Sequence, residues 1–518
     1  MPSHSSLHWL SLVGTIWLQT INGPNSDFPV YSSQLKDLKH ISQVQLNFLA
    51  FASDAGKLFG WFSGLAAIYL PLWSVAVIGA VFGLIGYGFQ FLFLDNSGLS
   101  YWHLFVLTAL AGNGICWINT VCYLICIRNF PSDSRVAVGI STSYVGLSAK
   151  IYTTVADAIF PPKKNLNVKT YLLLNAVMPM LITSLVAPFL RAIETTVETR
   201  TNSAFLVMFA ITLATGVCAV VGSIGSGLNG LSSRGHMLSM GILLVLPLLV
   251  PVIVTFRESI SKIWSEKREI RVHDVRLEEV EAGEGVIEAE VKEQVIEVGR
   301  TEGSNEVGGL EMLRKLDFWL YFFSYMFSAT LGLVFLNNLG QIAESRGLGE
   351  TSILVSLSSS FGFFGRLLPS FLDYYSSKSG YMISRPASMA ALMAPMAGAF
   401  FLLLNPRTCF LYMSTGIIGA CTGAITSIAV SATPELFGTK NFGVNHNIVV
   451  TNIPVGSFCF GYLAAFLYQQ RAGGNHRCFG TGCYNTTFII WGSVCSIAAL
   501  LCTVLYTRSR SFARRPKN

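Results

Sequence analysis

The residues of this sequence that could do chemistry are ionisable side chains set inside long apolar runs. Asp54 and Lys57 lie three residues apart in ASDAGKLFGWFSG, so on a helix they share a face and can form an ion pair. Lys150 lies in SYVGLSAKIYT, where Asp54, Asp157 or an anionic substrate could balance its charge. A charge in an apolar run is costly unless it faces a partner or a cavity, so these residues are candidates for solute binding or gating. The alternatives are a structural ion pair and a lysine bonded to backbone carbonyls.

Asparagine side chains and helix breakers form a second group of candidates. In QTINGPNSDFPVYSSQLK, Asn22 is followed by Gly23 and Pro24, which predict a helix that is broken at membrane depth and lines a binding site with its freed backbone groups. The alternative is that the first span ends there. Asn113 and Asn119 lie in AGNGICWINTVCY, where amides either bind a substrate or hold helices together.

Charged helix ends in the second half of the chain predict a gate. GFFGRLLPSFLD contains Arg366 and Asp373, and PELFGTKNFGVNHN begins with Glu435 at a helix boundary. Charges at such corners latch helix bundles together by ion pairs, or anchor the helix ends at the membrane surface. The glycines at positions 56, 60 and 64 repeat every four residues, which predicts a small-residue ridge where another helix packs closely.

Several kinds of active site are excluded by their missing motifs. The sequence has no G-x-x-x-x-G-K-[ST] loop for ATP, no G-x-S-x-G elbow and no H-E-x-x-H pair. No group of Cys and His residues has the spacing of a metal site. We therefore expect no enzyme activity, no catalytic residues, no cofactor, no metal and no nucleic-acid partner.

The elements that hold these residues are membrane helices. Hydrophobic residues make up 52% of the chain, charged residues only 12%, and the mean hydropathy is +0.53. Apolar runs of spanning length predict an all-α membrane protein with about fourteen transmembrane helices, since helices satisfy their backbone hydrogen bonds internally in lipid. The expected spans lie at roughly 8–28, 46–69, 72–94, 101–127, 135–160, 169–190, 203–226, 238–256, 316–341, 350–373, 383–404, 409–431, 441–468 and 488–507.

One segment differs in kind from the spans. Of the 28 Asp and Glu residues, 15 lie in 257–315, which is rich in Glu, Val and Gly and shows no helical apolar stripe. Such a composition predicts a disordered, acidic, cytoplasmic linker. It separates an N-terminal transmembrane region, 1–256, from a C-terminal transmembrane bundle, 316–518. Removal of most of 266–311 is expected to leave the fold intact.

The placement of Lys and Arg predicts the orientation. An even number of spans puts both termini and the linker on one side, and the basic C-terminal tail and the ten basic residues of the linker favour the cytoplasm. The sequon at Asn485 then lies outside the cytoplasm and is a glycosylation candidate. Cys478 and Cys483 lie in the same loop and are a candidate disulfide.

The quoted strings resemble a known family. QTINGPNSDFPVYSSQLK, ASDAGKLFGWFSG, AGNGICWINTVCY and SYVGLSAKIYT are similar to the nodulin-like domain of plant major facilitator superfamily proteins, and GRLLPS and PELFGTKNFG are similar to nuclear-fusion-defective-type members. The resemblance covers nearly the whole chain. It implies two six-helix bundles with two intervening helices, working by alternating access. The superfamily's Asp-Arg-Gly-Arg signature is missing after the second span, where Gly64-Leu65-Ala66-Ala67 stands instead.

The sequence thus predicts a secondary active transporter of a small solute in an integral, multi-pass arrangement in the lipid bilayer. Lys150 and the excess of Lys and Arg make an organic anion such as a monocarboxylate the first hypothesis, with a proton or an exchange partner as the coupling species. The alternative is a non-transporting membrane receptor or scaffold that uses the linker as a docking site. The sequence leaves open the substrate, the oligomeric state and the choice between plasma and vacuolar membrane.

The predicted orientation can be checked with sealed right-side-out vesicles. A protease added from outside is expected to leave the segment 257–315 intact, because that segment lies inside. Permeabilised vesicles serve as the control in which the same protease cleaves it. Cleavage in sealed vesicles would contradict the orientation.

Overall fold

The computed structural model describes residues 4–513 except 96–99, 160–166, 194–201, 225–232, 261–262, 265–305, 349–350, 379–382 and 474–477. Most of the predicted linker therefore lies outside the described residues. Within the described part, each expected span corresponds to one helix or to consecutive helices that continue one another. The architecture is all-helical, as predicted.

The first bundle consists of the helices that correspond to the first six spans. They are α1 (His4–Ile21) and α2 (Pro24–Lys39); α3 (Gln43–Ala55), η1 (Gly56–Phe59) and α4 (Trp61–Tyr69); α5 (Leu72–Phe93); α6 (Tyr101–Asn129); α7 (Ser134–Ser143), η2 (Tyr144–Leu147) and α8 (Ser148–Ile159); α9 (Asn167–Val186) and η3 (Ala187–Phe189). Two intervening spans follow, α10 (Asn202–Ile224) and α11 (Ser233–Val245), the latter continued by η5 (Leu246–Leu248).

The second bundle consists of the helices that correspond to the last six spans, preceded by one short helix. They are α13 (Gly309–Leu313); α14 (Leu316–Tyr325), η6 (Met326–Thr330) and α15 (Leu331–Ser345); α16 (Thr351–Lys378); α17 (Arg385–Leu402); α18 (Thr408–Phe437); α19 (Phe442–Val450) and α20 (Asn452–Ala472); η7 (Thr481–Cys483); α21 (Asn485–Ala513). Its core is built only from residues of this half of the chain.

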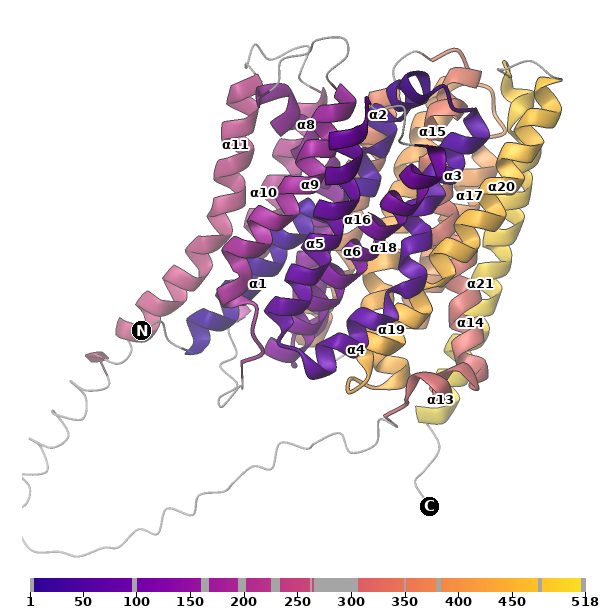
Figure 1. Cartoon of the computed structure of the whole chain (residues 1–518). Coiled ribbons are helices and arrows are strands. Elements are labelled where there is room, and N and C mark those ends of the chain that lie inside the picture. The colour runs from indigo at the N-terminus through magenta and orange to yellow at the C-terminus, as the bar shows by residue number, and fades with distance from the viewer. Residues whose placement is uncertain are drawn as a thin grey trace, which may run out of the picture.

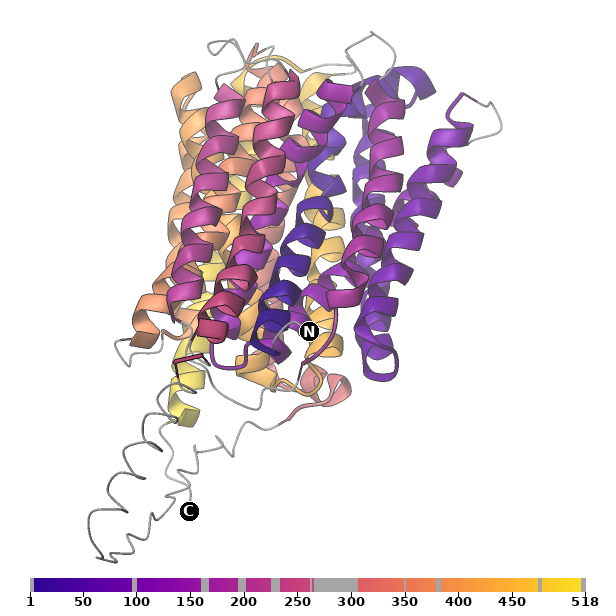
Figure 2. The ribbon, with the colours of Figure 1, turned by 90° about the vertical axis from the view of Figure 1, so that its left-hand side faces the viewer.

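The helices lie roughly parallel, with the two bundles side by side (Figure 1). α10 and α11 stand at one side of the assembly, where they contact α7, α8 and α16 (Figure 2). Nine helices in the described part are long and apolar enough by themselves to cross a membrane. Several of the other spans are interrupted by breaks or carry charges, such as the break between α1 and α2 and the charged residues of α3 and η1. The chain is an integral, multi-pass membrane protein.

The first span extends further than its predicted end near residue 28. α1 ends at Ile21, and α2 restarts at Pro24, whose missing N–H and fixed φ suit the first position of a helix. The Gly23 N–H between them donates to Ser148 Oγ at 3.1 Å, so α8 holds the break in place. The predicted break is therefore a joint within a longer span, and the helix continues to Lys39.

The first and last described residues, in α1 and α21, lie at one end of the assembly, which we call the terminal end. α1 begins there, and α4, α13 and α21 reach it as well (Figure 1). Asn485, the half-buried first residue of α21, lies at the opposite end. Cys478 and Cys483 also lie there and are joined by a disulfide bond.

The last part of the predicted linker belongs to the second bundle. The Val307 N–H donates to Phe437 O at 3.1 Å, and Val307 O accepts from Asn445 Nδ2 at 2.8 Å. Val307 and Met312 are both buried in the second core. A boundary at residue 315 is thus too late, because apolar side chains from residue 307 onward pack against α14 and α19. A deletion meant to spare the fold should end before Glu306.

This packing can be tested with two substitutions in α13. Met312→Ala should lower the free energy of unfolding in detergent by roughly 2–5 kcal/mol, since it removes a fully buried side chain. Leu310→Ala is the matched control: this side chain is 82% exposed, and a change within about 0.5 kcal/mol is expected. Equal effects of both substitutions on thermal unfolding would contradict the assignment of α13 to the core.

Candidate functional site

A cavity of about 190 Å³ lies between the two bundles. The first bundle contributes the joint between α1 and α2 together with parts of α2, α3, η1, α5, α6, α7 and η2, and the second contributes α14, α15, α16, α18, α19 and α20. Its polar or ionisable lining residues include Asn22, Tyr31, Ser53, Asp54, Lys57, Tyr87, Gln90, Thr108, Asn119, Tyr123, Thr142, Tyr325, Asn337, Arg366, Thr426, Ser427, His446 and Asn447. Because both halves of the chain line the cavity, a bound molecule would contact both.

Asn22 and Asn119 meet at the wall of this cavity. Asn22 Nδ2 donates to Asn119 Oδ1 at 2.9 Å and to the Ile115 carbonyl at 3.1 Å. Both donations tie the joint of the first span to α6. The two predicted residues thus form one polar patch, which combines the two roles that the sequence left open: the amides hold helices together and face the cavity.

Asp54 and Lys57 form the predicted ion pair, with Lys57 Nζ 2.6 Å from Asp54 Oδ1. The second carboxylate oxygen of Asp54 accepts from Ser457 Oγ of α20 at 2.7 Å. Asp54 therefore links the first bundle to the second at the cavity wall. The positive charge of Lys57 is balanced within its own helix turn, so the lysine and the aspartate together add no net charge to the cavity.

The glycine ridge packs as its spacing predicted. A Cβ added to Gly56 would lie 2.0 Å from the Ala109 carbonyl oxygen of α6, and one added to Gly64 would lie 2.3 Å from the Gly443 carbonyl of α19. Only glycine fits at both positions. The contact of Gly64 with Gly443 closes the two bundles against each other near the terminal end, at the place where the superfamily's charged signature is missing.

Two sequence candidates do not line the cavity. Asn113 Oδ1 accepts from Trp117 Nε1 of its own helix at 3.1 Å, and both residues face a shallow outer hollow. Lys150 is absent from the cavity lining, and the charge that acts on it is that of Asp157 on the same helix. The pairing of Lys150 with Asp54 that the sequence allowed is not present, because Asp54 is bonded to Lys57 and Ser457.

Arg366 lines the cavity and is not part of the gate that the sequence predicted for it. Its Nη1 donates to the Gly362 carbonyl of α16 at 3.2 Å, and its charge acts on the hydroxyls of Tyr123 and Tyr325 across the cavity. No ion pair joins Arg366 to a carboxylate in the described part of the chain. The guanidinium is half-buried and turned to the cavity.

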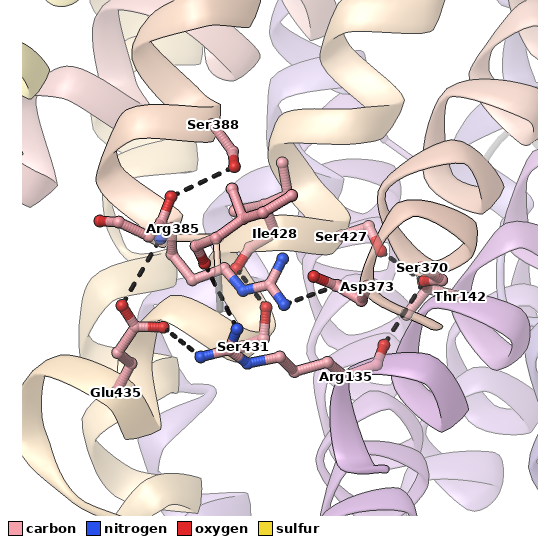
Figure 3. A network of polar contacts seen from close by, with 12 residues as sticks. Arg135, Thr142, Ser370, Asp373, Arg385, Ser388, Ser427, Ile428, Ser431 and Glu435 are labelled. Atoms are coloured by element: carbon pink, nitrogen blue, oxygen red, sulfur yellow. Dashed lines mark hydrogen bonds and ion pairs between the residues drawn. The ribbon is translucent and has the colours of Figure 1, made fainter. Parts of the chain in front are cut away.

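The other charged corners do form a network at the terminal end (Figure 3). Arg135 of α7 binds Glu435 of α18, with Nη2 2.7 Å from Oε2. Arg385 of α17 binds Asp373 of α16 at 2.6 Å, and its backbone N–H donates to Glu435 Oε1 at 3.5 Å. Arg135 is the member from the first bundle, so the Arg135–Glu435 pair is the ionic connection between the bundles here.

Hydroxyl contacts extend this closure toward the cavity. Thr142 Oγ1 of α7 lies 3.2 Å from Ser427 Oγ of α18, and Ser370 Oγ donates to the Arg135 carbonyl at 3.4 Å (Figure 3). Thr142 and Ser427 also line the cavity and so form part of its floor. In this structure the terminal end is closed below the cavity.

Sequence reasoning missed several of these residues. Arg135 and Arg385 were not among the sequence candidates, yet they supply the cations of the gate. Asn447 Nδ2 donates to Thr120 Oγ1 at 2.8 Å, which ties the second bundle to α6. The sequence did contain a signal for these arginines, since the carboxylates of Asp373 and Glu435 at helix ends each need a cation nearby. In the part of the chain that the structure describes, no group of His, Cys, Asp and Glu could hold a metal ion.

Two family models match the chain. One is described as Nodulin-like and covers residues 8–256, and the other is described as the NFD4 C-terminal domain and covers residues 301–514. Protein NUCLEAR FUSION DEFECTIVE 4 of Arabidopsis thaliana is 36% identical over 98% of this chain and 90% of its own length. Probable transporter MCH1 of Yarrowia lipolytica is 25% identical over 35% of this chain and 40% of its own length.

Solved structures show the same fold at low identity. The proton:xylose symporter XylE, a major facilitator superfamily protein, matches with a TM-score of 0.54 and 13% identity over 96% of this chain and 95% of the other. A double Trp mutant of XylE reaches 0.56 at 12% identity, over 97% and 96%. A proton dependent oligopeptide transporter reaches 0.54 at 12% identity, over 98% and 100%. The fold is that of the major facilitator superfamily.

The Arg135–Glu435 pair predicts how firmly the terminal end is closed. Both side chains are partly exposed, so the pair contributes about 0.5–1 kcal/mol. Arg135→Gln should therefore raise the open population at this end roughly two- to fivefold. The measurement is the rate at which a water-soluble maleimide, added from the terminal side, labels a cysteine at position 142. The variants are made in a chain whose exposed cysteines, Cys218, Cys409 and Cys459, have been replaced by serine so that they do not react with the maleimide.

The matched control is Lys315→Gln, whose pair with Glu311 lies wholly within the second bundle. This substitution should leave the labelling rate unchanged. Faster labelling in both variants would indicate general loosening, and no change in either would show that the ion pair does not hold the end closed.

Proposed function

The chain belongs to the nodulin-like family and carries a C-terminal domain of the NFD4 type, and on that premise we propose that it is a secondary transporter of a small organic anion. The solute binds in the central cavity and crosses the membrane by alternating access. In this proposal the chain is a carrier and not an enzyme. The observation that carries the proposal is Arg366, a cavity-facing guanidinium with no carboxylate partner in the described residues.

The position of the cavity supports transport. It lies between two bundles, and the core of the second bundle is built only from residues of its own half, so this bundle can move as one body. Such rocking of one bundle against the other around a fixed site is how alternating access works. Solute bound to both walls favours states in which the bundles approach each other.

The charges of the lining support an anion. Lys57 is neutralised by Asp54, while the Arg366 charge is left to the cavity. Guanidinium groups bind carboxylates through two parallel hydrogen bonds, and hydroxyls such as those of Tyr123 and Tyr325 can complete the site. The anion hypothesis therefore rests on Arg366 and no longer on Lys150.

The closure at the terminal end supports alternation. Its ion pair between the bundles is partly exposed. Hydroxyl bonds, the contact of Gly64 with Gly443 and apolar packing of α16 and α19 residues against the first bundle accompany this pair. None of these interactions buries an unpaired charge when it breaks, because water reaches helix ends. The ionic and hydroxyl contacts of this closure can therefore break at a small cost in free energy. In this proposal the structure represents a state closed at the cytoplasmic side.

The alternative function is that of a membrane receptor or scaffold without transport. A scaffold would move no solute through the cavity, so the variants described next would all show the same solute flux. The solutes named for the structural neighbours, xylose and oligopeptides, give two further comparisons. Solute flux thus separates transport from scaffolding, and the panel of solutes separates anions from neutral and zwitterionic cargo.

Uptake into vesicles bearing the purified chain tests the proposal. The labelled solutes are acetate, lactate and pyruvate, with xylose and a dipeptide for comparison. Arg366→Gln should lower anion uptake at least tenfold, because it removes charge-assisted hydrogen bonds worth about 1.5–3 kcal/mol. Arg366→Lys should be intermediate, since it keeps the charge and loses the two-pronged geometry.

The matched control is Lys150→Met, which removes a positive charge of α8 that is not part of the cavity lining. Its uptake per folded protein should equal that of the unmodified chain. The reverse pattern, with Lys150→Met inactive and Arg366→Gln normal, would return the substrate site to the residue that the sequence favoured. Equal uptake by protein-free vesicles and vesicles bearing the unmodified chain would favour the scaffold.

A further inference from the structure

Asp27 is a carboxyl group that the proposed transport site leaves unexplained. It lies in α2, just beyond the joint at Asn22, and its side chain is completely buried. Oδ1 accepts a long hydrogen bond of 3.4 Å from Asn175 Nδ2 of α9. Oδ2 is buried without any hydrogen-bond partner among the described residues.

The groups around Asp27 are tyrosine hydroxyls and not bases. Its charge acts on tyrosines of α2, α5, α8 and α9, namely Tyr31, Tyr87, Tyr152 and Tyr171. Another carboxylate, Asp157 of α8, acts on Tyr171 and is itself offset by Lys150. Helices α3 and α16 also contact α2. Among the residues that the structure describes, none of the groups that act on Asp27 itself carries a positive charge.

Asn175 has a matching deficiency. Its Oδ1 is also buried without a hydrogen-bond partner in the described part of the chain. The carboxyl of Asp27 and the amide of Asn175 thus share one weak hydrogen bond and leave one acceptor each unsatisfied. Two unsatisfied acceptors side by side are costly, and an unpaired carboxylate in an apolar interior costs far more.

A single proton removes both deficiencies. Protonated Asp27 has a hydroxyl that can donate to Asn175 Oδ1, while the Asn175 amide continues to donate to Asp27 Oδ1. The acid and the amide then form a ring of two hydrogen bonds after a small rotation of either side chain. We propose that Asp27, with Asn175 as its positioning residue, is the proton-binding site of this transporter.

The site lies where proton binding can influence solute binding. Tyr31 and Tyr87 line the cavity, so their hydroxyls offer a path between the water of the cavity and the buried carboxyl. Asn22, at the start of the same joint, faces the cavity and bonds to Asn119. In the packing of this structure Asp27 holds its proton; when α2 moves away from α9 and water enters, it releases the proton. The coupling part of this inference rests on the proposed function, but the proton-binding part does not.

Infrared difference spectroscopy of the full chain in lipid vesicles tests proton binding without any solute. A protonated carboxyl gives a C=O stretching band that disappears when it ionises. The unmodified chain should show such a band at neutral pH and lose it at alkaline pH. Asp27→Asn should abolish the band, because an amide of the same size replaces the acid. Asp54→Asn is the matched control and should keep it, since Asp54 is ion-paired with Lys57.

A second variant keeps the assignment open to refutation if Asp27→Asn does not fold. Asn175→Leu removes the hydrogen-bond acceptor, so the band should remain but shift to higher frequency. A band that is unchanged in both Asp27→Asn and Asn175→Leu, or absent from the unmodified chain, would overturn the site.

Coupling is tested separately with a pH dye inside the vesicles. If the unmodified chain moves an anion of the panel, Asp27→Asn should still exchange labelled for unlabelled anion but should lose proton uptake and accumulation. Retained proton-driven accumulation in Asp27→Asn would overturn coupling through this residue. If the panel contains no transported solute, the proposed function fails while the infrared result still decides the proton site.

Discussion

The cost of placing a charge in an apolar interior governs where the buried ionisable residues of the described structure lie. Lys57 and Arg385 are each bonded to a carboxylate, Asp54 and Asp373, within 2.6 Å. Arg366 has no such partner among the described residues and faces the cavity, where water or an anion can solvate it. The same constraint makes these positions informative about function. A charge that the protein does not neutralise itself marks the place where something from outside the chain must do so.

The described ion pair between the bundles differs in burial from the ion pairs within them. Each bundle holds a largely buried ion pair of its own: Lys57 is bound to Asp54 in the first, and Arg385, which is 2% exposed, is bound to Asp373 in the second. Between the bundles the ionic contact at the terminal end is the exposed pair of Arg135 and Glu435, supplemented by close backbone approach at Gly64. Buried pairs are expensive to break, whereas exposed pairs and glycine contacts exchange readily with water. The division suits two rigid bodies that separate and close again.

The sequence predicted the features that depend on composition and on spacing along one helix. It did not predict the positions of residues that are set by packing between helices. Apolar length located the spans, and spacing along one helix paired Asp54 with Lys57. Arg366 was assigned to the gate because it lies in the same string as Asp373, yet seven residues of helix place it about 10 Å deeper. Val307 looked like linker because its flanking residues are Glu and Gly, and only its fit against Phe437 makes it core. Asp27 stands in a string quoted for its helix breakers, and nothing local shows that α9 would bury it.

The joint between α1 and α2 connects these observations. Gly23 and Pro24 allow one span to be two helices. Asn22 lies in the joint beside them, and α2 carries Asp27 one to two turns beyond Asn22. Solute near Asn22 would therefore act at the joint itself, and a proton on Asp27 would act on α2, the helix that follows the joint. An unbroken helix would transmit the same forces to the whole span, including the packed terminal end of α1. The break confines the response to α2, which lies against α8 and α9 and ends on the opposite side from the gate. Gly23 and Pro24, the predicted helix breakers, thus separate α2, which can move when a solute or a proton binds, from α1, which stays packed at the terminal end.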